Sequence, residues 1–181
     1  MRLQQNPFPL DTARLRLRPY EAGDLDAMAA MFGDPDVTAF TFLGRQDREG
    51  TAKVLAGYMA FVAEHGYGMC AILDRADGSY LGEAGLFVTP MGPLALRYAL
   101  NKAAWGKGYA VEASAAILDD GFGRLGFDRL IAGVIPANSA SNRVMDKLGF
   151  VPGGILSAGG HEFRVFEITA EAWRARGSRT P

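Results

Sequence analysis

Two glycines, Gly106 and Gly108, stand one residue apart directly before a stretch with helical periodicity, and Lys107 lies between them. Glycine costs a helix roughly 0.5–1 kcal/mol relative to alanine, so helix formation alone does not explain the pair. First-turn N–H groups lack partners inside the helix, and the helix dipole makes that end attractive to anions. The turn therefore predicts a phosphate site, with Lys107 adding charge; the alternative is a tight turn whose glycines only permit an unusual φ.

Two well-known phosphate motifs do not fit this turn. A P-loop would place Gly-Lys-Ser or Gly-Lys-Thr after a longer loop, and none follows. A dinucleotide fingerprint counted from Gly106 would need its third glycine at Val111. The next apolar run, residues 129–135, leads into "PAN", with no acid to hold a ribose hydroxyl. The pattern indicates a diphosphate carrier other than NAD or ATP.

Periodicity places the turn among alternating helices and strands. Residues 13–20 alternate arginine with leucine, which predicts a half-buried strand with Leu15 and Leu17 on the buried face. Elsewhere, apolar residues at helical spacing predict helices, and apolar runs between turn residues predict strands. The expected helices are 24–32, 47–65, the segment after Gly108, and 138–150. The further strands are 68–74, 80–89, 94–101, 129–135 and 161–169, and one or two strands close the chain. A turn is expected at 33–37 and a frayed turn at 170–177.

The helix after the glycines joins two strands. Residues 129–135 are apolar on both faces, as in a strand covered on both sides. A strand, a helix of this length and a buried strand make a right-handed parallel crossover. The fold class is therefore expected to be α+β, with a mixed, mostly antiparallel sheet and one parallel β-α-β crossover. The stripe expected to face the sheet is Val111, Ala115, Leu118, Phe122 and Leu125.

Composition limits the class of protein. The chain has 181 residues, 49% hydrophobic and 22% charged, which suits one domain with a buried core. Lys and Arg number 19 against 20 Asp and Glu, so we expect no nucleic-acid partner. The sequence has no signal-peptide core and no run of about 18 apolar residues, so we expect a cytoplasmic protein without a membrane partner. The one cysteine, Cys70, predicts a buried thiol, and no residue cluster suggests a metal.

Three segments together resemble the GCN5-related N-acetyltransferase (GNAT) superfamily. They are "LDTARLRLRPYEAGD" (10–24), "WGKGYAVEA" (105–113) and "VIPANSASNRVMDKLGFVPGG" (134–154), in the family's order. They are most similar to the branch of ribosomal-protein N-terminal acetyltransferases, the RimJ/RimL type. The resemblance runs from Leu10 to Trp173, and implies one N-acetyltransferase domain over residues 1–181 with its core at about 10–173. It also implies the acyl-CoA N-acyltransferase fold, acetyl-CoA as co-substrate and an amine as acceptor.

The resemblance further implies where acetyl-CoA binds. The family's phosphate loop falls on residues 105–111, and the pantetheine arm lies between the strands 94–101 and 129–136. A backbone N–H near Leu100 polarises the thioester carbonyl, and the "N-x-x-S-N" segment from Asn138 meets the pantetheine and thiol, although helix capping also explains Asn138. The expected cofactor-binding residues are Leu100, Trp105, Gly106, Lys107, Gly108, Tyr109, Ala110, Val111, Asn138, Ser141 and Asn142.

The general base is where the sequence departs from the family. Relatives commonly carry a glutamate early in the fourth strand of the fold, and Ala95 stands at the matching place. The first substitute is Glu83 on the neighbouring strand, and the second is Glu162 in the last strand; a solvated strand position is the alternative for each. Ser141, by its position, is the acid that protonates the leaving thiolate.

The two histidines, His65 and His161, are weaker candidates for catalysis. His65 falls at the end of a helix, where a cation suits the dipole. His161 begins the last strand, near where the acceptor site of such enzymes lies.

A missing base bears on the acceptor. Neutralising a lysine amine of pKa near 10.4 at pH 7 costs roughly 4.6 kcal/mol, against about 1.2 kcal/mol for an α-amino group near 7.8. We therefore expect an α-amine or another low-pKa amine; the acceptor segments, 34–50 and 153–162, carry no motif that identifies it. The competing readings are a non-catalytic CoA-binding sensor, transfer of a different acyl group, and a nucleotide-binding module, which the missing fingerprint disfavours. A homodimer is the family tendency.

Overall fold

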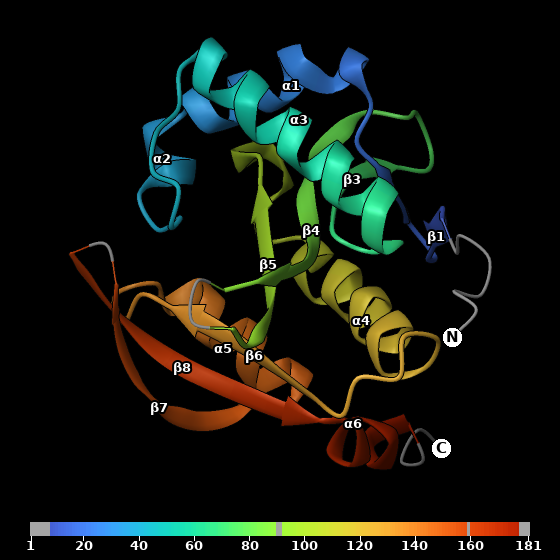
Figure 1. Cartoon of the computed structure of the whole chain (residues 1–181), viewed down its shortest axis with the longest axis vertical. Helices are drawn as coiled ribbons and strands as arrows, with labels where there is room; N and C mark the ends of the chain where they lie inside the picture. Colours follow the sequence, from blue (N-terminus) through green and yellow to red (C-terminus); the bar gives the residue numbers. More distant parts are fainter. Residues whose placement is uncertain (1–7, 90–91, 159, 178–181) are drawn as a thin grey trace.

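The computed structural model describes residues 8–89, 92–158 and 160–177, and they form one mixed sheet with helices on both faces (Figure 1). The strand order is β1-β2-β3-β4-β5-β6-β8-β7, and among these neighbours only β5 and β6 run parallel. The expected α+β class with one parallel crossover is confirmed. The strands are β1 (Leu10–Asp11), β2 (Leu15–Pro19), β3 (Met69–Asp74), β4 (Tyr80–Val88), β5 (Leu94–Leu100), β6 (Arg129–Val134), β7 (Val151–Ala158) and β8 (His161–Thr169).

The helices divide between the two faces of the sheet. Helices α1 and α3 cover one face, and α4, which connects β5 to β6, covers the other together with α5. Short 3₁₀ turns stand at Ala22–Asp24 and Lys102–Ala104. The helices are α1 (Leu25–Gly33), α2 (Pro35–Thr38), α3 (Arg48–His65), α4 (Tyr109–Phe122), α5 (Ser139–Leu148) and α6 (Ala170–Gly177).

Local signals set the ends of two long helices. Asp47 precedes α3, and its carboxylate accepts a hydrogen bond from the Gly50 N–H at 2.7 Å. Gly66 ends the same helix in the left-handed region, at φ 71°. Asn138 caps α5 in the same way, accepting from the Ser141 N–H at 3.0 Å. These caps satisfy first-turn N–H groups, so the helix boundaries follow from residues within a few positions.

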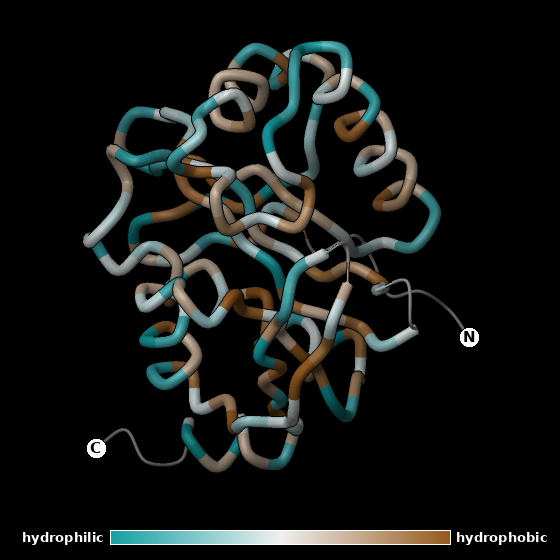
Figure 2. The backbone as a smooth tube through the Cα atoms, turned by 90° about the vertical axis from the view of Figure 1, so that its left-hand side faces the viewer, coloured by the Kyte–Doolittle hydropathy of each residue, from teal (hydrophilic) through white to brown (hydrophobic). Residues whose placement is uncertain are grey.

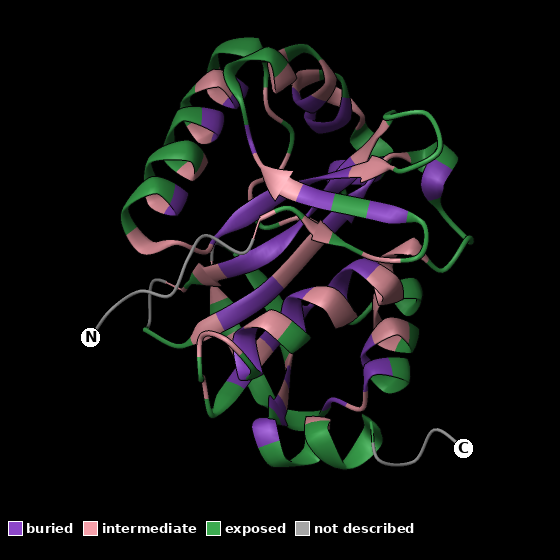
Figure 3. Cartoon of the chain, turned by 90° about the vertical axis from the view of Figure 1, so that its right-hand side faces the viewer, coloured by how far each residue is buried: buried purple, intermediate pink, exposed green. Residues whose placement is uncertain are grey.

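Each face of the sheet has its own apolar cluster. Leu15 and Leu17 are fully buried in the cluster on the α4 side, as the alternation of β2 predicted, and Cys70 is buried beside them. The second cluster lies under α1 and α3 and includes Met28 and Phe32. Figure 2 shows most of the hydrophobic stretches inside the molecule, and Figure 3 shows the central strands largely buried and the outer sides of the helices exposed. In the described part of the chain, no helix is both long and apolar enough to cross a membrane.

Two strands close the sheet, within the expected one or two, because β7 pairs with β8 along its length, with an irregularity at its glycines. Three expectations about single elements need correction. Residues 33–37 are not a simple turn, because Asp34 caps and Pro35 starts the short helix α2. Residues 170–177 form helix α6 rather than a frayed turn. Helix α4 buries a face rotated from the expected stripe: Ala113, Ser114, Ile117, Leu118, Gly121 and Phe122.

Candidate functional site

Strands β5 and β6 separate after a single paired position, Ala95 with Ile131. On the other side of β5, the Asn101 N–H donates to the Leu81 carbonyl at 2.9 Å. Successive residues of a strand direct their backbone groups to opposite sides, so the N–H groups of Tyr98 and Leu100 point away from β4, toward the gap. The gap between the two parallel strands is thus edged by backbone donors and acceptors that a ligand can pair with.

The glycine turn lies at one end of this gap. Gly106 and Gly108 have φ values of 72° and 81°, in the left-handed region where only glycine is unstrained. Gly108 is the N-cap of α4, and among the residues that the structure describes no side chain caps this helix start. A Cβ on Gly106 would meet nothing within 4 Å, and one on Gly108 would come within 3.6 Å of the Arg14 guanidinium only. The turn is therefore open toward the cavity, and its geometry suits both a tight turn and an anion seat.

Arg14 braces the turn from β2's side of the sheet. Its guanidinium donates to the Lys107 carbonyl at 2.9 Å and to the Glu112 carboxylate at 2.7 Å, and lies 4.5 Å from the centre of the Tyr109 ring. Thr12 also donates to Glu112, at 2.6 Å. Desolvation raises the pKa of Glu112, but these hydrogen bonds outweigh it and leave the pKa below its usual value. These contacts join residues about a hundred positions apart, so no local pattern indicates them.

One cavity of about 480 Å³ joins the turn to the rest of the site. It runs from α4 past the gap and α5 to the loop after α2 and the inner faces of β7 and β8. Of the residues expected to bind acetyl-CoA, those that line it are Leu100, Trp105, Gly106, Gly108, Tyr109, Ala110, Val111, Asn138 and Ser141. Lys107 and Asn142 are outside this set: Lys107 is exposed, and the Asn142 amide donates to the Asn138 carbonyl at 2.8 Å.

A tyrosine that the sequence analysis gave no role stands beside Ser141. The Tyr98 hydroxyl is buried against the cavity and, within the described residues, has no well-oriented hydrogen-bond partner. Burial raises the pKa of Tyr98 to about 12, an effect that the Ser141 hydroxyl partly offsets. Buried hydroxyls are normally paired, so this one is a group that a ligand in the gap would satisfy. Because its pKa is high, it stays protonated and available as a donor at neutral pH.

Glu83 is not the exposed strand residue that the sequence allowed. Its side chain is fully buried under α1 and α3 and forms an ion pair with Arg97. Its other oxygen accepts from the Tyr20 hydroxyl at 3.0 Å, and the Tyr58 hydroxyl accepts from Arg97. Both oxygens are therefore engaged, and the carboxylate is outside the described residues that line the cavity. The geometry argues against Glu83 as the base that meets the amine.

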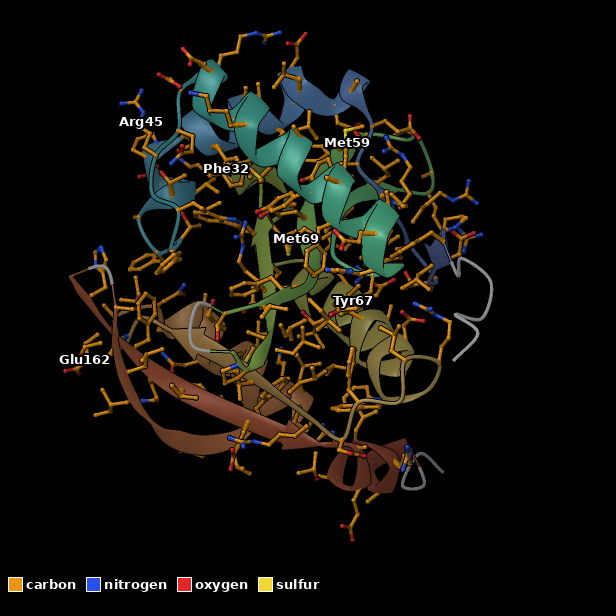
Figure 4. All side chains as sticks on the ribbon, in the orientation of Figure 1. Phe32, Arg45, Met59, Tyr67, Met69 and Glu162 are labelled. Carbon is orange, nitrogen blue, oxygen red and sulfur yellow. The ribbon has the colours of Figure 1, made fainter. Side chains whose placement is uncertain are left out.

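Glu162 is likewise not among the described residues that line the cavity. It is exposed on β8 opposite Ser157, and Figure 4 shows it at the outer edge of the molecule. His161 is exposed next to it, with its ring 6.3 Å from that of Phe163. His65 ends α3 and packs edge-on against Phe61 at 4.2 Å. Among the described residues lining the cavity, the one carboxylate is Asp36, which pairs with Lys102.

Sequence comparisons agree with this arrangement. The acetyltransferase (GNAT) domain family matches residues 14–151. The chain is 31% identical over 144 residues to the uncharacterized protein YkkB of Bacillus subtilis (strain 168), covering 77% of this chain and 83% of YkkB. It is 28% identical over 150 residues to an uncharacterized N-acetyltransferase of Bacillus licheniformis, p20, covering 81% and 84% of the two chains.

Solved structures share the fold over nearly the whole chain. An acetyltransferase from Agrobacterium tumefaciens str. C58 superposes with a TM-score of 0.77 at 27% identity, over 88% of this chain and 92% of its own. RimJ of Mycobacterium smegmatis, solved with CoA-disulfide, superposes at 0.70 and 22% identity, over 90% and 89%. A split parallel pair, an uncapped glycine turn and a match over most of the sequence define an acyl-transfer domain. The chain belongs to the GNAT family of acetyltransferases.

Proposed function

We propose that this chain is an acetyl-CoA-dependent N-acetyltransferase that acetylates a primary amine of low pKa, in a protein N-terminus or a small molecule. The observation that carries the proposal is the continuous cavity, which extends from the open glycine turn along the gap between β5 and β6 to the loop after α2. Such a cavity has room for a long carrier at one end and an acceptor at the other.

The residues present fit coenzyme A on three counts. The uncapped start of α4 offers N–H groups to a pyrophosphate, and each such hydrogen bond to a charged group is worth roughly 1.5–3 kcal/mol. Strand β5 directs backbone groups into the gap, where the amides of a pantetheine arm would pair with them. The buried Tyr98 hydroxyl lies next to Ser141, has no well-oriented partner among the described residues, and could form a hydrogen bond with a ligand in the gap.

When bound, acetyl-CoA supplies a thioester whose carbonyl carbon an amine can attack, with the CoA thiolate as the leaving group. In this chain, the N–H groups of Tyr98 or Leu100 would donate to the oxygen that gains negative charge, as an oxyanion hole does. The Ser141 hydroxyl, with Tyr98 beside it, would donate a proton to the departing sulfur and recover one, through water, from the nitrogen that forms the new C–N bond. These roles use groups that already face the gap.

The amine reaches this site without a carboxylate at position 95. Ala95 lines the cavity, while Glu83 is held by Arg97 under the opposite helices. A weak base acting through water can remove a proton from a low-pKa amine far more readily than from lysine, by the difference of about 3.4 kcal/mol in the cost of neutralisation. We therefore propose an α-amino group, or an amine of similar pKa, as the acceptor.

The RimJ/RimL type remains our proposal for the branch. The chain shares its fold with M. smegmatis RimJ at 22% identity, and the structure of that protein contains CoA-disulfide. This shared fold is in keeping with the RimJ/RimL type and with the use of CoA here. A cytoplasmic location and a homodimer stay predictions.

Release of the CoA thiol tests the proposal. Purified protein with acetyl-CoA is given a peptide with a free α-amine and, separately, the same peptide with a blocked N-terminus and one lysine. We expect the α-amine to give a kcat/KM at least tenfold higher. Faster acetylation of the lysine peptide would contradict the proposed acceptor.

A non-catalytic CoA-binding domain is the second candidate, and the alanine at position 95 favours it. Tight CoA binding by calorimetry with no thiol release for any amine would establish this candidate instead. Release from propionyl-CoA or a longer thioester, and not from acetyl-CoA, would point to a different acyl group.

A further inference from the structure

We propose that the acceptor carries an aromatic ring, or a side chain of similar bulk and polarity, next to its amine. This inference rests on the proposed function, because it assigns the chamber beyond the gap to the acceptor. The chamber is the part of the cavity lined by the loop after α2 and by the inner faces of β4, β5, β6 and β8.

Four phenylalanine rings line the chamber from different directions. Phe40 and Phe42 come from the loop after α2 and leave 44% and 48% of their surface exposed. Phe163 on β8 faces them, with its ring 6.2 Å from that of Phe42 at an angle of 47°. Phe87 on β4 closes the side next to Arg97. Large rings left this open to a cavity gain by contact with an apolar ligand, most of all with another ring.

Small residues make space among these rings. Ala95 on β5 lines the cavity with a single methyl group, and Gly133 on β6 places no side chain beside Phe163: a Cβ on Gly133 would lie 3.7 Å from that ring. Ile131, paired with Ala95, adds apolar surface on the same face. The position of the usual carboxylate has thus become part of an apolar floor.

Two charged side chains that line this part of the cavity, Arg97 and Asp36, have counter-ions. Arg97 is neutralised by Glu83 from beneath, and Asp36 at the rim by Lys102. A polycationic acceptor needs carboxylates free to meet its second charge, and among the described lining residues none is free. The chamber therefore favours a single amine on an apolar body over a polyamine, an aminoglycoside or the amino end of a basic peptide.

A matched set of amino-acid amides tests this inference. Phenylalaninamide, alaninamide, serinamide and lysinamide share an α-amine of low pKa and differ in the group beside it. We expect kcat/KM for phenylalaninamide to exceed that for each of the other three at least tenfold. Tripeptides that begin with Phe or Ser distinguish a small-molecule acceptor from a protein N-terminus. Turnover of the Phe tripeptide requires a chamber that is open to the longer chain, as a protein acceptor would need.

Phe42→Ala is the test variant, since its ring is half exposed and its loss should leave the fold intact. We expect it to lower kcat/KM for phenylalaninamide about tenfold, with the KM for acetyl-CoA unchanged. Ile155→Ala, which removes a side chain 71% exposed on β7, is the control and should change neither value. Equal turnover of the four amides, or a Phe42→Ala variant that treats phenylalaninamide as the native protein does, would overturn the inference.

Binding of the products separates this inference from the proposed function. N-acetylphenylalaninamide and N-acetylalaninamide are titrated into the CoA complex by calorimetry. Preference for the aromatic product, lost in Phe42→Ala, supports the chamber assignment even if no amine is turned over, in which case only the catalytic proposal fails. If the two products bind equally and any amide is turned over, the acetyltransferase proposal holds and the inference of an aromatic acceptor is wrong.

Discussion

At the scale of single residues, Gly106 combines two functions that its position alone did not distinguish. Its left-handed φ of 72° requires glycine for the turn, and its missing Cβ leaves the approach to the start of α4 open. Gly78, in the hairpin between β3 and β4, has a φ of 75° and equally open surroundings, but lies away from the cavity. The pair therefore allows backbone strain and ligand binding to be measured apart.

Gly106→Ala and Gly78→Ala should each destabilise the fold by about 1–2 kcal/mol, because alanine is strained in the left-handed region. Only Gly106→Ala should weaken CoA binding, by about 10–100-fold, since the new methyl group displaces a phosphate from at least one N–H. Urea denaturation and calorimetric titration of both variants check this. Equal CoA affinity in the two variants would remove the phosphate role of the turn.

Glu83 is a residue whose burial decides its function. The carboxylate of a buried ion pair cannot be removed without leaving the Arg97 charge without its counter-ion, with the Tyr58 hydroxyl as its remaining acceptor. Glu83→Gln should therefore lower the free energy of unfolding by about 3–5 kcal/mol, while Glu162→Gln, at an exposed position, should change it by less than about 0.5 kcal/mol. Adding Arg97→Met to Glu83→Gln should recover part of the loss. A Glu83→Gln variant with native stability and no turnover would instead make this residue the base.

At the scale of elements, the start of α4 depends on β2 and on the residues just before it. Thr12 and Arg14 hold Glu112 in the first turn of the helix, and Arg14 also holds the carbonyl of Lys107. The negative charge of Glu112 is thus balanced by Arg14, and the helix end keeps its attraction for an anion. The proposed phosphate site therefore depends on two elements that are far apart in the sequence.

The stability that the contacts of Glu112 with Thr12 and Arg14 contribute should depend on pH. Because the pKa of Glu112 is lower in the folded protein than its ordinary value of 4.5, the ionised form stabilises the fold above that value and the contribution disappears as pH falls through the folded pKa. We expect Glu112→Gln to be less stable than the native protein by about 1–3 kcal/mol at pH 7 and to approach it below pH 4. Urea titrations at both pH values measure the difference. A difference that stays constant with pH would show that Glu112 acts by packing alone.

At the scale of the whole molecule, the sheet consists of two parts that the cavity separates. The apolar cluster on the α4 side includes Leu96 of β5 and Leu130 of β6, so α4 and its contacts bridge the gap. A ligand that lies between β5 and β6 adds bonds to both parts and should stabilise the domain as one unit.

CoA at one hundred times its dissociation constant should add about 2.7 kcal/mol to the stability. For a domain of this length that corresponds to a rise in Tm of roughly 5–11 °C. Pantetheine, which lacks the pyrophosphate, should give a clearly smaller rise at the same concentration. Thermal scans with both compounds check this, and equal shifts would place the main binding energy away from the glycine turn.

Much of the fold can be predicted from local signals in the sequence, but the general base cannot. The caps Asp47 and Asn138 and the alternation around Leu15 act within a few residues, so the sequence displays them. The pairing of Glu83 with Arg97 depends on the register of β4 and β5 and on helices that cover both faces, which makes a strand position that looked half exposed fully buried. The sequence allows one or two closing strands, because Gly153 and Gly154 favour a loop. In the structure β8 pairs with residues 151–158 and makes them a strand.

The single paired position between β5 and β6 has a consequence for turnover. With so few direct bonds between the two parts, we expect the domain without a ligand to depend on α4 for their alignment, and each departure of CoA to reduce the bonds that join them. Product release and internal cohesion are therefore coupled, and a change that tightens α4 against the sheet would slow the exit of CoA as it raises the melting temperature.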